Sequence, residues 1–343
     1  MSAVFEERRA YTERVFAKLS QSLQETLRER QAAVIGDHTC VYATGSCGRG
    51  EMGPRSDLDA YVVGRGDRSE EDSEFLQDAI RRANAQADLP PLDGGGRHTK
   101  PIAAETLIDR LGSPEDDTSE DGAFTKRMLL LLESRVMIGE SAYNSVIDDV
   151  VGAYWQNAEL HRQNYQPFVL VNDIVRWWRI VLLNHESRLR EREQKLQRDA
   201  SLSDAARGEL LLAERRYRSY KMRLARCMTC FSALTYLLAL VPTDQSHVST
   251  SDIRTMVGLQ PLERIAKLPE LVDGCGFVPE ILSAYGQFLE RTEPGKEAFL
   301  DQLRSDRAWG REVTMEGSHF TELVFKLVET LGGGRRLHRH MLV

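Results

Sequence analysis

The sequence predicts an α+β protein, in which a small mixed sheet near the N-terminus is followed by an all-helical domain. Two observations support this class. Short β-branched and apolar runs, which are typical of strands, lie within the first 140 residues. After about residue 155 the apolar residues recur at helical spacing and strand signals end. Because 343 residues suffice for two domains, we expect a first domain over 1–140, a helical domain over 141–331 and a flexible basic tail over 332–343.

The first domain combines helical periodicity with short strand-like runs. Asp67 or Ser69, just after the second of these runs, is placed to cap a helix. In chain order, the expected elements are a helix over 3–33, strands over 38–44 and 57–63, a helix to about Ala87, a weak strand over His98–Ala103, and helices over Phe124–Ile138 and Ser141–Tyr154.

The second domain shows helical periodicity throughout. Its expected helices are Pro167–His185 with a charged continuation to Arg198, one long helix from Ser203 towards Val241, and shorter helices over 250–257, 261–272, 278–293, 295–306 and 319–331.

Charge and composition narrow the functional classes. The net charge of −7 argues against a protein that grips DNA over its whole surface, although it is compatible with a local basic groove. The chain is charged from Glu6 onward, unlike a secretory signal, and its longest apolar run, Cys227 to Val241, is too short and polar for a bilayer. Cys227 and Cys230 in that run are expected to be core residues. We therefore expect a cytoplasmic protein without a membrane partner or dedicated DNA binding.

The chemistry concentrates in the stretch from Thr44 to Val63. Its second strand-like run carries Asp57 and Asp59 on either side of Leu58. Side chains alternate along a strand, so the two carboxylates project to one face while Leu58 points into the core. Two carboxylates so close repel each other unless a cation lies between them. Mg²⁺ bound by one or two carboxylates and by substrate phosphates satisfies this arrangement.

A small-residue turn precedes the acid pair. Gly45 and Ser46 offer backbone N–H groups and a hydroxyl, which are suited to gripping phosphate oxygens. We expect them to hold the β- and γ-phosphates of a nucleoside triphosphate (NTP). A phosphate-binding turn that lies about a dozen residues before a metal-binding acid pair predicts nucleotidyl transfer.

These motifs together resemble the signature of the DNA polymerase β-type nucleotidyltransferase superfamily. They are Gly45-Ser46, Arg49-Gly50-Glu51 and Ser56-Asp57-Leu58-Asp59. The residues of these motifs are most similar to those of bacterial uridylyltransferases and adenylyltransferases that modify nitrogen-regulatory PII-type proteins. The resemblance is strong over 36–65 and looser over 30–140, and it implies a polymerase β-like catalytic domain. The alternative is a Gly-rich turn before a strand whose acids merely face solvent.

Two further residues of the motif belong to the expected nucleotide-binding set. Arg49 is able to reach phosphates, because guanidinium groups form bidentate contacts with them. In the alternative, Arg49 forms a salt bridge with Glu51 that shapes the loop. The hydroxyl of Ser56 is expected to brace the turn rather than to react.

The resemblance also implies a third carboxylate on a later strand. The expected strand His98–Ala103 contains no acid, and the nearest candidates are Glu105 and Asp93. We take Glu105 as the third catalytic residue. Without a third acid, another group would deprotonate the acceptor, or the domain would bind nucleotide without turnover.

The helical domain contains a basic segment. Between Arg188 and Arg226 lie twelve Lys or Arg and six Asp or Glu, a net charge of +6, which leaves −13 for the rest of the chain. The resemblance implies that a helical domain closes over the nucleotide and offers basic residues. Lys221 and Arg223 are our candidates for triphosphate contacts. The alternative is a solvated charged face.

Three functions follow from these features. The first is Mg²⁺-dependent transfer of a nucleoside monophosphate from NTP to an acceptor hydroxyl, with protein or RNA favoured over a small molecule. Because the C-terminal half shows no sign of the hydrolase or small-molecule-sensing domains that accompany the uridylyltransferases, a standalone enzyme of the toxin or phage-defence kind is expected. The second is a synthase of cyclic or linear oligonucleotide messengers. The third is an inactive nucleotide-binding sensor.

Overall fold

The chain forms two compact units. The computed structural model describes residues 3–66, 69–92, 96, 98–113, 115–118, 122–161, 163–199 and 201–342. The first unit comprises Met1–Val169 and His247–Gln260, and the second comprises Leu170–Ser246 and Pro261–Val343. The first unit therefore extends past the expected boundary at 140 and includes a later segment of the chain.

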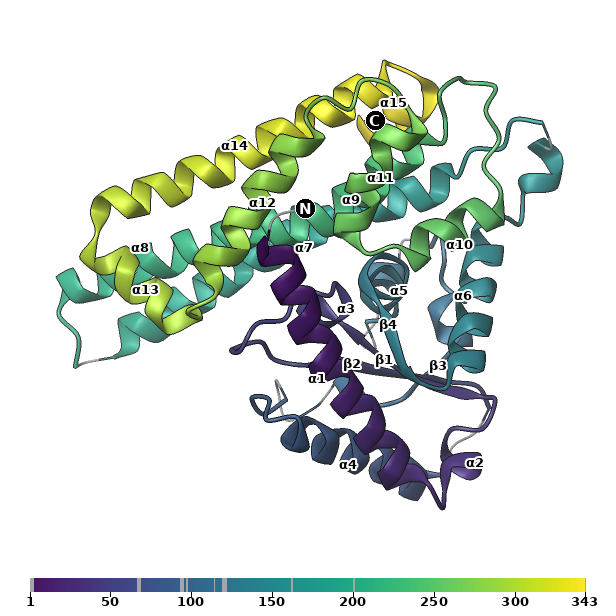
Figure 1. Ribbon diagram of the computed structural model, residues 1–343, viewed down its shortest axis with the longest axis horizontal. Helices are drawn as coiled ribbons and strands as arrows, with labels where there is room; N and C mark the ends of the chain where they lie inside the picture. Colours follow the sequence, from purple (N-terminus) through teal and green to yellow (C-terminus); the bar gives the residue numbers. More distant parts are fainter. Residues whose placement is uncertain are drawn as a thin grey trace. The chain divides into compact units, whose positions relative to one another are not determined.

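The first unit is built on a mixed four-stranded sheet (Figure 1), as the sequence predicts. Its strands are β1 (Thr39–Thr44), β2 (Asp59–Gly64), β3 (Ile102–Ala103) and β4 (Arg135–Ile138), in the order β3-β2-β1-β4. β1 is antiparallel to both β2 and β4, whereas β3 is parallel to β2. The fold is therefore α+β.

Two strands differ from the prediction. The predicted helix Phe124–Ile138 is wrong at its C-terminal end, because α5 (Ala123–Glu133) stops and β4 follows. β4 pairs with the edge of β1, whose backbone groups need hydrogen-bond partners. The expected strand His98–Ala103 is reduced to its last two residues, β3.

Helices cover both faces of the sheet. Leu23 of α1 and Ile80 of α4 belong to one apolar cluster with Val41 and Val62, which share a sheet face. On the other face, the ring of Tyr42 lies 6.0 Å from that of Tyr143 in α6. Besides α5, the helices of this unit are α1 (Ala3–Leu27), α2 (Gln31–Val34), α3 (Gly45–Gly48), α4 (Glu70–Gln86), η2 (Glu105–Leu107), η3 (Asp116–Thr118), α6 (Glu140–Tyr154), η4 (Ala158–His161) and α10 (Thr250–Gly258).

Ser69 caps α4, as one of the two predicted alternatives. Its side chain accepts a hydrogen bond from the backbone N–H of Asp72 at 3.0 Å. The other candidate, Asp67, lies outside the described residues.

The segment His247–Gln260 belongs to the first unit through specific contacts. Arg254 of α10 forms an ion pair with Asp148 of α6 at 3.2 Å. The indole N–H of Trp155 donates to the backbone oxygen of Val248 at 3.2 Å, and the N–H of Val248 donates to the oxygen of Tyr165 at 2.9 Å. These bonds anchor both the start of this segment and α10 to the unit.

The second unit is helical. Its elements are α7 (Phe168–Arg198, whose first two residues belong to the first unit), α8 (Asp204–Lys221), the π-helical turn η5 (Met222–Arg226), α9 (Cys227–Ala239), α11 (Pro261–Leu271), α12 (Val278–Thr292), α13 (Lys296–Ser305), α14 (Arg307–Gly332) and α15 (Arg336–Leu342). The predicted helix from Ser203 to Val241 is thus interrupted by η5, and α14 starts earlier than expected. Residues predicted as a flexible tail form α15 instead.

Cys227 and Cys230 lie in α9 and are buried, which confirms the prediction that they are core residues. None of the helices in the described part of the chain has the length and apolar character that a membrane crossing needs.

Candidate functional site

The acid pair lies where β2 begins. Asp59 is the first residue of β2 and pairs with Thr44, the last residue of β1. Leu58 belongs to the buried apolar cluster that α1 and α4 form with the sheet. Asp57 and Asp59 therefore project from the opposite face of the sheet. Asp59 is half-buried and Asp57 is exposed. The carboxylate of Asp57 forms no hydrogen bond or ion pair with the residues that the structure describes.

Gly45 lies directly against Asp59. Its φ of +63° belongs to the left-handed region, which favours glycine. A Cβ atom added to Gly45 would lie 2.6 Å from Oδ2 of Asp59, closer than van der Waals contact allows. The antiparallel register of β1 and β2 thus brings the turn and the acid pair together.

This contact makes Gly45→Ala a sharp test. We expect the variant to displace the Asp59 carboxylate and to reduce nucleotidyl transfer by about a hundredfold, because small misplacements of reacting groups are costly. Gly50→Ala is the matched control: Gly50 has a φ of +71°, but a Cβ there meets nothing within 4 Å. Both variants should lose about 1–2 kcal/mol of stability from the left-handed backbone. Equal transfer rates, measured beside thermal unfolding, would contradict the assigned contact.

Ser46 and Cys47 continue the turn in α3. The side chain of Ser46 is half-buried and makes no hydrogen bond with the described residues, so its hydroxyl remains available to a ligand. Burial raises the pKa of the Cys47 thiol to about 12. Cys47 is therefore a neutral thiol at physiological pH and is not a nucleophile here.

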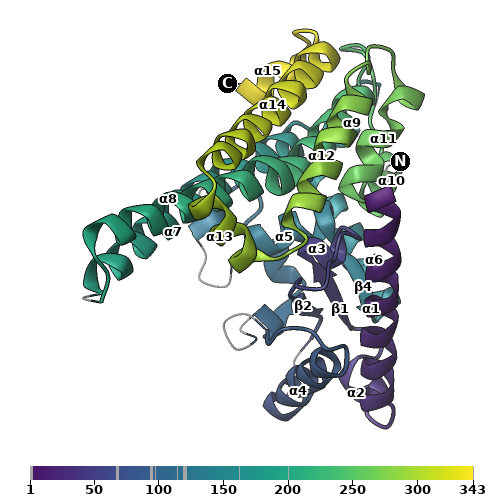
Figure 2. The same ribbon diagram turned by 60° about the vertical axis from the view of Figure 1, so that its left-hand side comes forward.

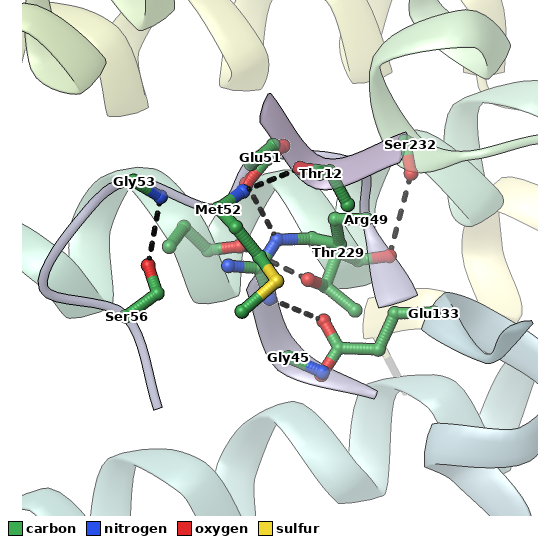
Figure 3. A network of polar contacts seen from close by, with 11 residues as sticks. Thr12, Gly45, Arg49, Glu51, Met52, Gly53, Ser56, Glu133, Thr229 and Ser232 are labelled. Carbon is green, nitrogen blue, oxygen red and sulfur yellow. Dashed lines mark hydrogen bonds and ion pairs between the residues drawn. The ribbon is translucent and has the colours of Figure 1, made fainter. Parts of the chain in front are cut away.

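A buried ionic network contacts the Gly45–Ser46 turn and holds it in place (Figure 3). We call Arg49, Glu51 and Glu133 the Arg49 clamp. The guanidinium of Arg49 binds Glu51 and Glu133, each at 2.7 Å. The second oxygen of Glu133 accepts a hydrogen bond from the backbone N–H of Gly45 at 3.3 Å. The exposed side-chain fractions are 9% for Arg49, 4% for Glu51 and 0% for Glu133.

The clamp changes two expected roles. Arg49 forms the salt bridge with Glu51 that was the alternative to a phosphate contact, and both of its carboxylate partners are buried. The N–H of Gly45 points to Glu133 rather than to an incoming phosphate. Gly45 and Arg49 therefore shape the site, whereas Ser46 remains the candidate for phosphate contact.

The position of Glu133 in this network was not predicted from the sequence. Glu133 lies 88 residues after Gly45 in the sequence, at the polar end of an apolar helix, and gives no local motif. The available signal was a glutamate at the end of the run Leu129–Leu132, because an acid beside such a run requires a partner when it is buried.

Helix α1 fixes the loop between the turn and the acid pair. The backbone N–H of Met52 donates to Oγ1 of Thr12 at 2.9 Å, and Gly53 packs against the guanidinium of Arg8. Oγ of Ser56 accepts from the N–H of Gly53 at 3.0 Å, as drawn in Figure 3. Ser56 thus braces the turn, which is the role that the sequence predicts.

The third-acid candidates do not join the pair. Glu105 follows β3 and lies 4.0 Å from Arg65, which follows the C-terminal end of β2. Asp59 begins β2, so about 17 Å of strand separates the two ends. The structure therefore does not bring Glu105 to the acid pair, and the alternative, Asp93, lies outside the described residues.

Lys221 and Arg223 lie in the second unit. The ammonium group of Lys221 is 5.7 Å from the ring centre of Tyr217, and Arg223 donates to Oγ of Ser318 at 2.6 Å. Their contact with a triphosphate stays a prediction.

The metal-binding capacity of the site rests on two carboxylates. Among the described residues, no group of three or more His, Cys, Asp or Glu is arranged to hold a metal ion. Two acids on one face, of which Asp57 is exposed, fit Mg²⁺, since this ion is usually held by one or two carboxylates together with substrate phosphates.

Comparison with known families agrees with this geometry. Residues 22–93 match the family model described as the nucleotidyltransferase domain. This segment is a nucleotidyltransferase domain of the polymerase β-like superfamily. The match runs from within α1 to just beyond α4 and includes the turn, the acid pair and both strands that carry them. No curated protein and no solved structure matches the chain.

Proposed function

We propose that the nucleotidyltransferase domain moves a nucleoside monophosphate from NTP to an acceptor hydroxyl, with Mg²⁺ held by Asp57 and Asp59. One observation carries the proposal: the register of β1 and β2 places the Gly45–Ser46 turn against the Asp59 carboxylate. Phosphates gripped at the turn would lie beside the acids. Transfer needs this juxtaposition, because positioning and charge neutralisation supply most of the catalysis.

Each residue has a distinct part in the proposed reaction. Asp57 and Asp59 hold the metal, which when bound neutralises charge on the phosphates. The hydroxyl of Ser46 orients the β- and γ-phosphates, and the Arg49 clamp keeps the turn in place. The acceptor hydroxyl gives up its proton to solvent, and its oxygen forms a bond to the α-phosphorus while the bond between the α-phosphorus and its bridging oxygen breaks, which releases pyrophosphate.

The test uses the four NTPs labelled with ³²P at the α-position. Purified protein and Mg²⁺ are incubated with each NTP, alone and with cell lysate, beside the Asp57→Asn, Asp59→Asn double variant. Products are resolved on a protein gel, an RNA gel and a thin-layer plate. We expect a labelled macromolecule with the wild type only. Equal labelling by the double variant would refute the proposal.

Other products would identify the alternatives. A labelled, phosphatase-resistant small molecule made without lysate would indicate an oligonucleotide synthase. A nucleotide-binding sensor is the second candidate function, and the lack of a third carboxylate beside the pair among the described residues favours it. Nucleotide binding without pyrophosphate release would establish this sensor role. Protein labelling would support the likeness to uridylyltransferases and adenylyltransferases and the standalone toxin or phage-defence role.

A further inference from the structure

A group of positive charges surrounds one buried carboxylate in the second unit. Glu214 of α8 has an exposed side-chain fraction of 3%. Lys296 of α13 lies 3.1 Å from it, Arg218 of α8 lies 3.2 Å from it, and Arg192 of α7 lies 3.6 Å from it. Three cations on one carboxylate leave a local charge of +2.

Two exposed arginines extend this group. Arg215 follows Glu214 on α8, and Arg188 lies one helical turn before Arg192 on α7. Neither forms an ion pair with the described residues. We call Arg188, Arg192, Arg215, Arg218 and Lys296 the basic cluster. With Glu214 included, its net charge is +4.

The register of the two helices places these residues together. α7 and α8 lie side by side (Figure 2), joined between Arg192 and Glu214 and between His185 and Ser219, whose polar atoms are 3.5 Å apart. Burial, and then the positive charges of Arg218 and Arg215, lower the pKa of His185. Glu186 opposes this effect without cancelling it. Arg215 and Arg218 of α8 therefore both act on a side chain of α7.

The opposite flank of α7 differs in charge. There Arg179 and Arg190 alternate with Glu186 and Glu193 at helical spacing, so the flank is neutral. Exposed Leu183 lies on this flank too, at 70% exposure. A membrane-binding helix needs an extended apolar face next to its cations. The cations on α7 have no such face, and on α8 one exposed apolar side chain, Leu212, lies about one turn before Arg215. Glu191 is an exposed acid of α7 that lies three residues after Arg188. It forms no ion pair with the described residues.

The chemistry of the cluster fits a phosphate chain. Four of its five cations are arginines, whose planar guanidinium groups bind phosphates in pairs of hydrogen bonds. The segment 188–226 carries +6 whereas the rest of the chain carries −13, so a polyanion would be attracted here and repelled elsewhere. RNA is a polyanion that also carries terminal hydroxyl groups, the kind of group that nucleotidyl transfer requires.

We propose that the basic cluster binds the phosphate backbone of a single-stranded RNA, and that this RNA is the acceptor in the transfer. The role of this RNA as the acceptor rests on the proposed function. The cluster would supply affinity without sequence specificity, since phosphate contacts carry no base information.

Binding is tested with a fluorescently labelled 20-nucleotide RNA by anisotropy at several salt concentrations. The test variant is Arg188→Gln, Arg215→Gln, which removes exposed charges and leaves the partners of Glu214 in place. Its matched control is Arg179→Gln, Arg190→Gln on the neutral flank. Two lost contacts should lower the slope of log K against log salt by about 1.4 and weaken binding about 25-fold at 0.1 M salt. The control should bind as the wild type does.

Several outcomes would overturn the binding proposal. These are equal losses in both variants, no loss in either, tighter binding of DNA of the same sequence, or binding of phosphatidylserine vesicles in place of RNA. The α-³²P assay then tests the acceptor. If the labelling of RNA is weaker with the test variant than with the control variant, the result supports RNA as the acceptor. Label on protein alone overturns the RNA acceptor and leaves nucleotidyl transfer intact, whereas cluster-dependent RNA binding without any label counts against the proposed function.

Discussion

Replacing Asp57 and Asp59 together by asparagine is expected to reduce nucleotidyl transfer by about a thousandfold or more. Metal ions supply several kcal/mol of charge stabilisation in such reactions, and each 1.36 kcal/mol is a factor of ten in rate. The fold should persist, because Asp57 is exposed, Asp59 is half-buried and asparagine has nearly the same shape. Transfer rates measured with and without Mg²⁺, beside thermal unfolding curves, test both parts.

Asp37→Asn is the control for this variant. Asp37 is exposed, forms no ion pair with the described residues, and precedes β1 at the opposite end of the sheet from Asp59. It should transfer at the wild-type rate. If the double variant kept more than a tenth of wild-type activity, the metal assignment would be wrong.

The second large effect is expected at Glu133. Glu133→Ala should lower the free energy of unfolding by about 2–4 kcal/mol, because it removes a buried, charged hydrogen-bond partner and leaves a buried N–H group unsatisfied. Here Arg49 would keep Glu51, but the N–H of Gly45 would lose its acceptor. Urea denaturation measures this change.

An exposed ion pair provides the comparison. Glu13 binds Arg135 through both oxygens, at 2.8 and 2.7 Å, but half of its side chain is exposed. Glu13→Ala should therefore cost no more than about 1 kcal/mol. Similar losses at Glu13 and Glu133 would contradict the structural weight given to the clamp.

Glu133 is also a positioning residue, and this role has a separate readout. In Glu133→Gln the amide oxygen is still able to accept from Gly45, so the fold should be better kept than in the alanine variant. Under conditions where this variant is folded, we expect KM for NTP to rise, since the turn that carries Ser46 is held less firmly. An unchanged KM would restrict Glu133 to a purely structural role.

The local part of the site was accessible from the sequence. The strands β1 and β2 begin within two residues of the predicted positions, and the roles of Leu58 and Ser56 follow from neighbours in the chain. A strand, a glycine turn and an alternation of faces are all properties of a few consecutive residues. The family match over 22–93 supports the same region.

Features that depend on distant pairing were missed. The run Leu129–Leu132 continues into Val136 and Ile138 without a Gly or Pro to mark a break, so the sequence favours one helix. Only the edge of β1 specifies β4, and only the folded sheet brings Glu133 to Gly45. The salt bridge of Arg49 with Glu51, two residues apart, was predicted as an alternative; its second partner, 84 residues away, was not.

The discontinuity of the first unit bears on how the protein is made. Because α10 belongs to the unit that carries the acid pair, a ribosome must synthesise the chain beyond residue 258 before that unit has all its parts. Until then the residues of α6 that receive Arg254 lack their partner. The nascent first unit therefore waits until the whole helical segment 170–246 has been translated, and a fragment that ends at 169 would reproduce this unfinished state.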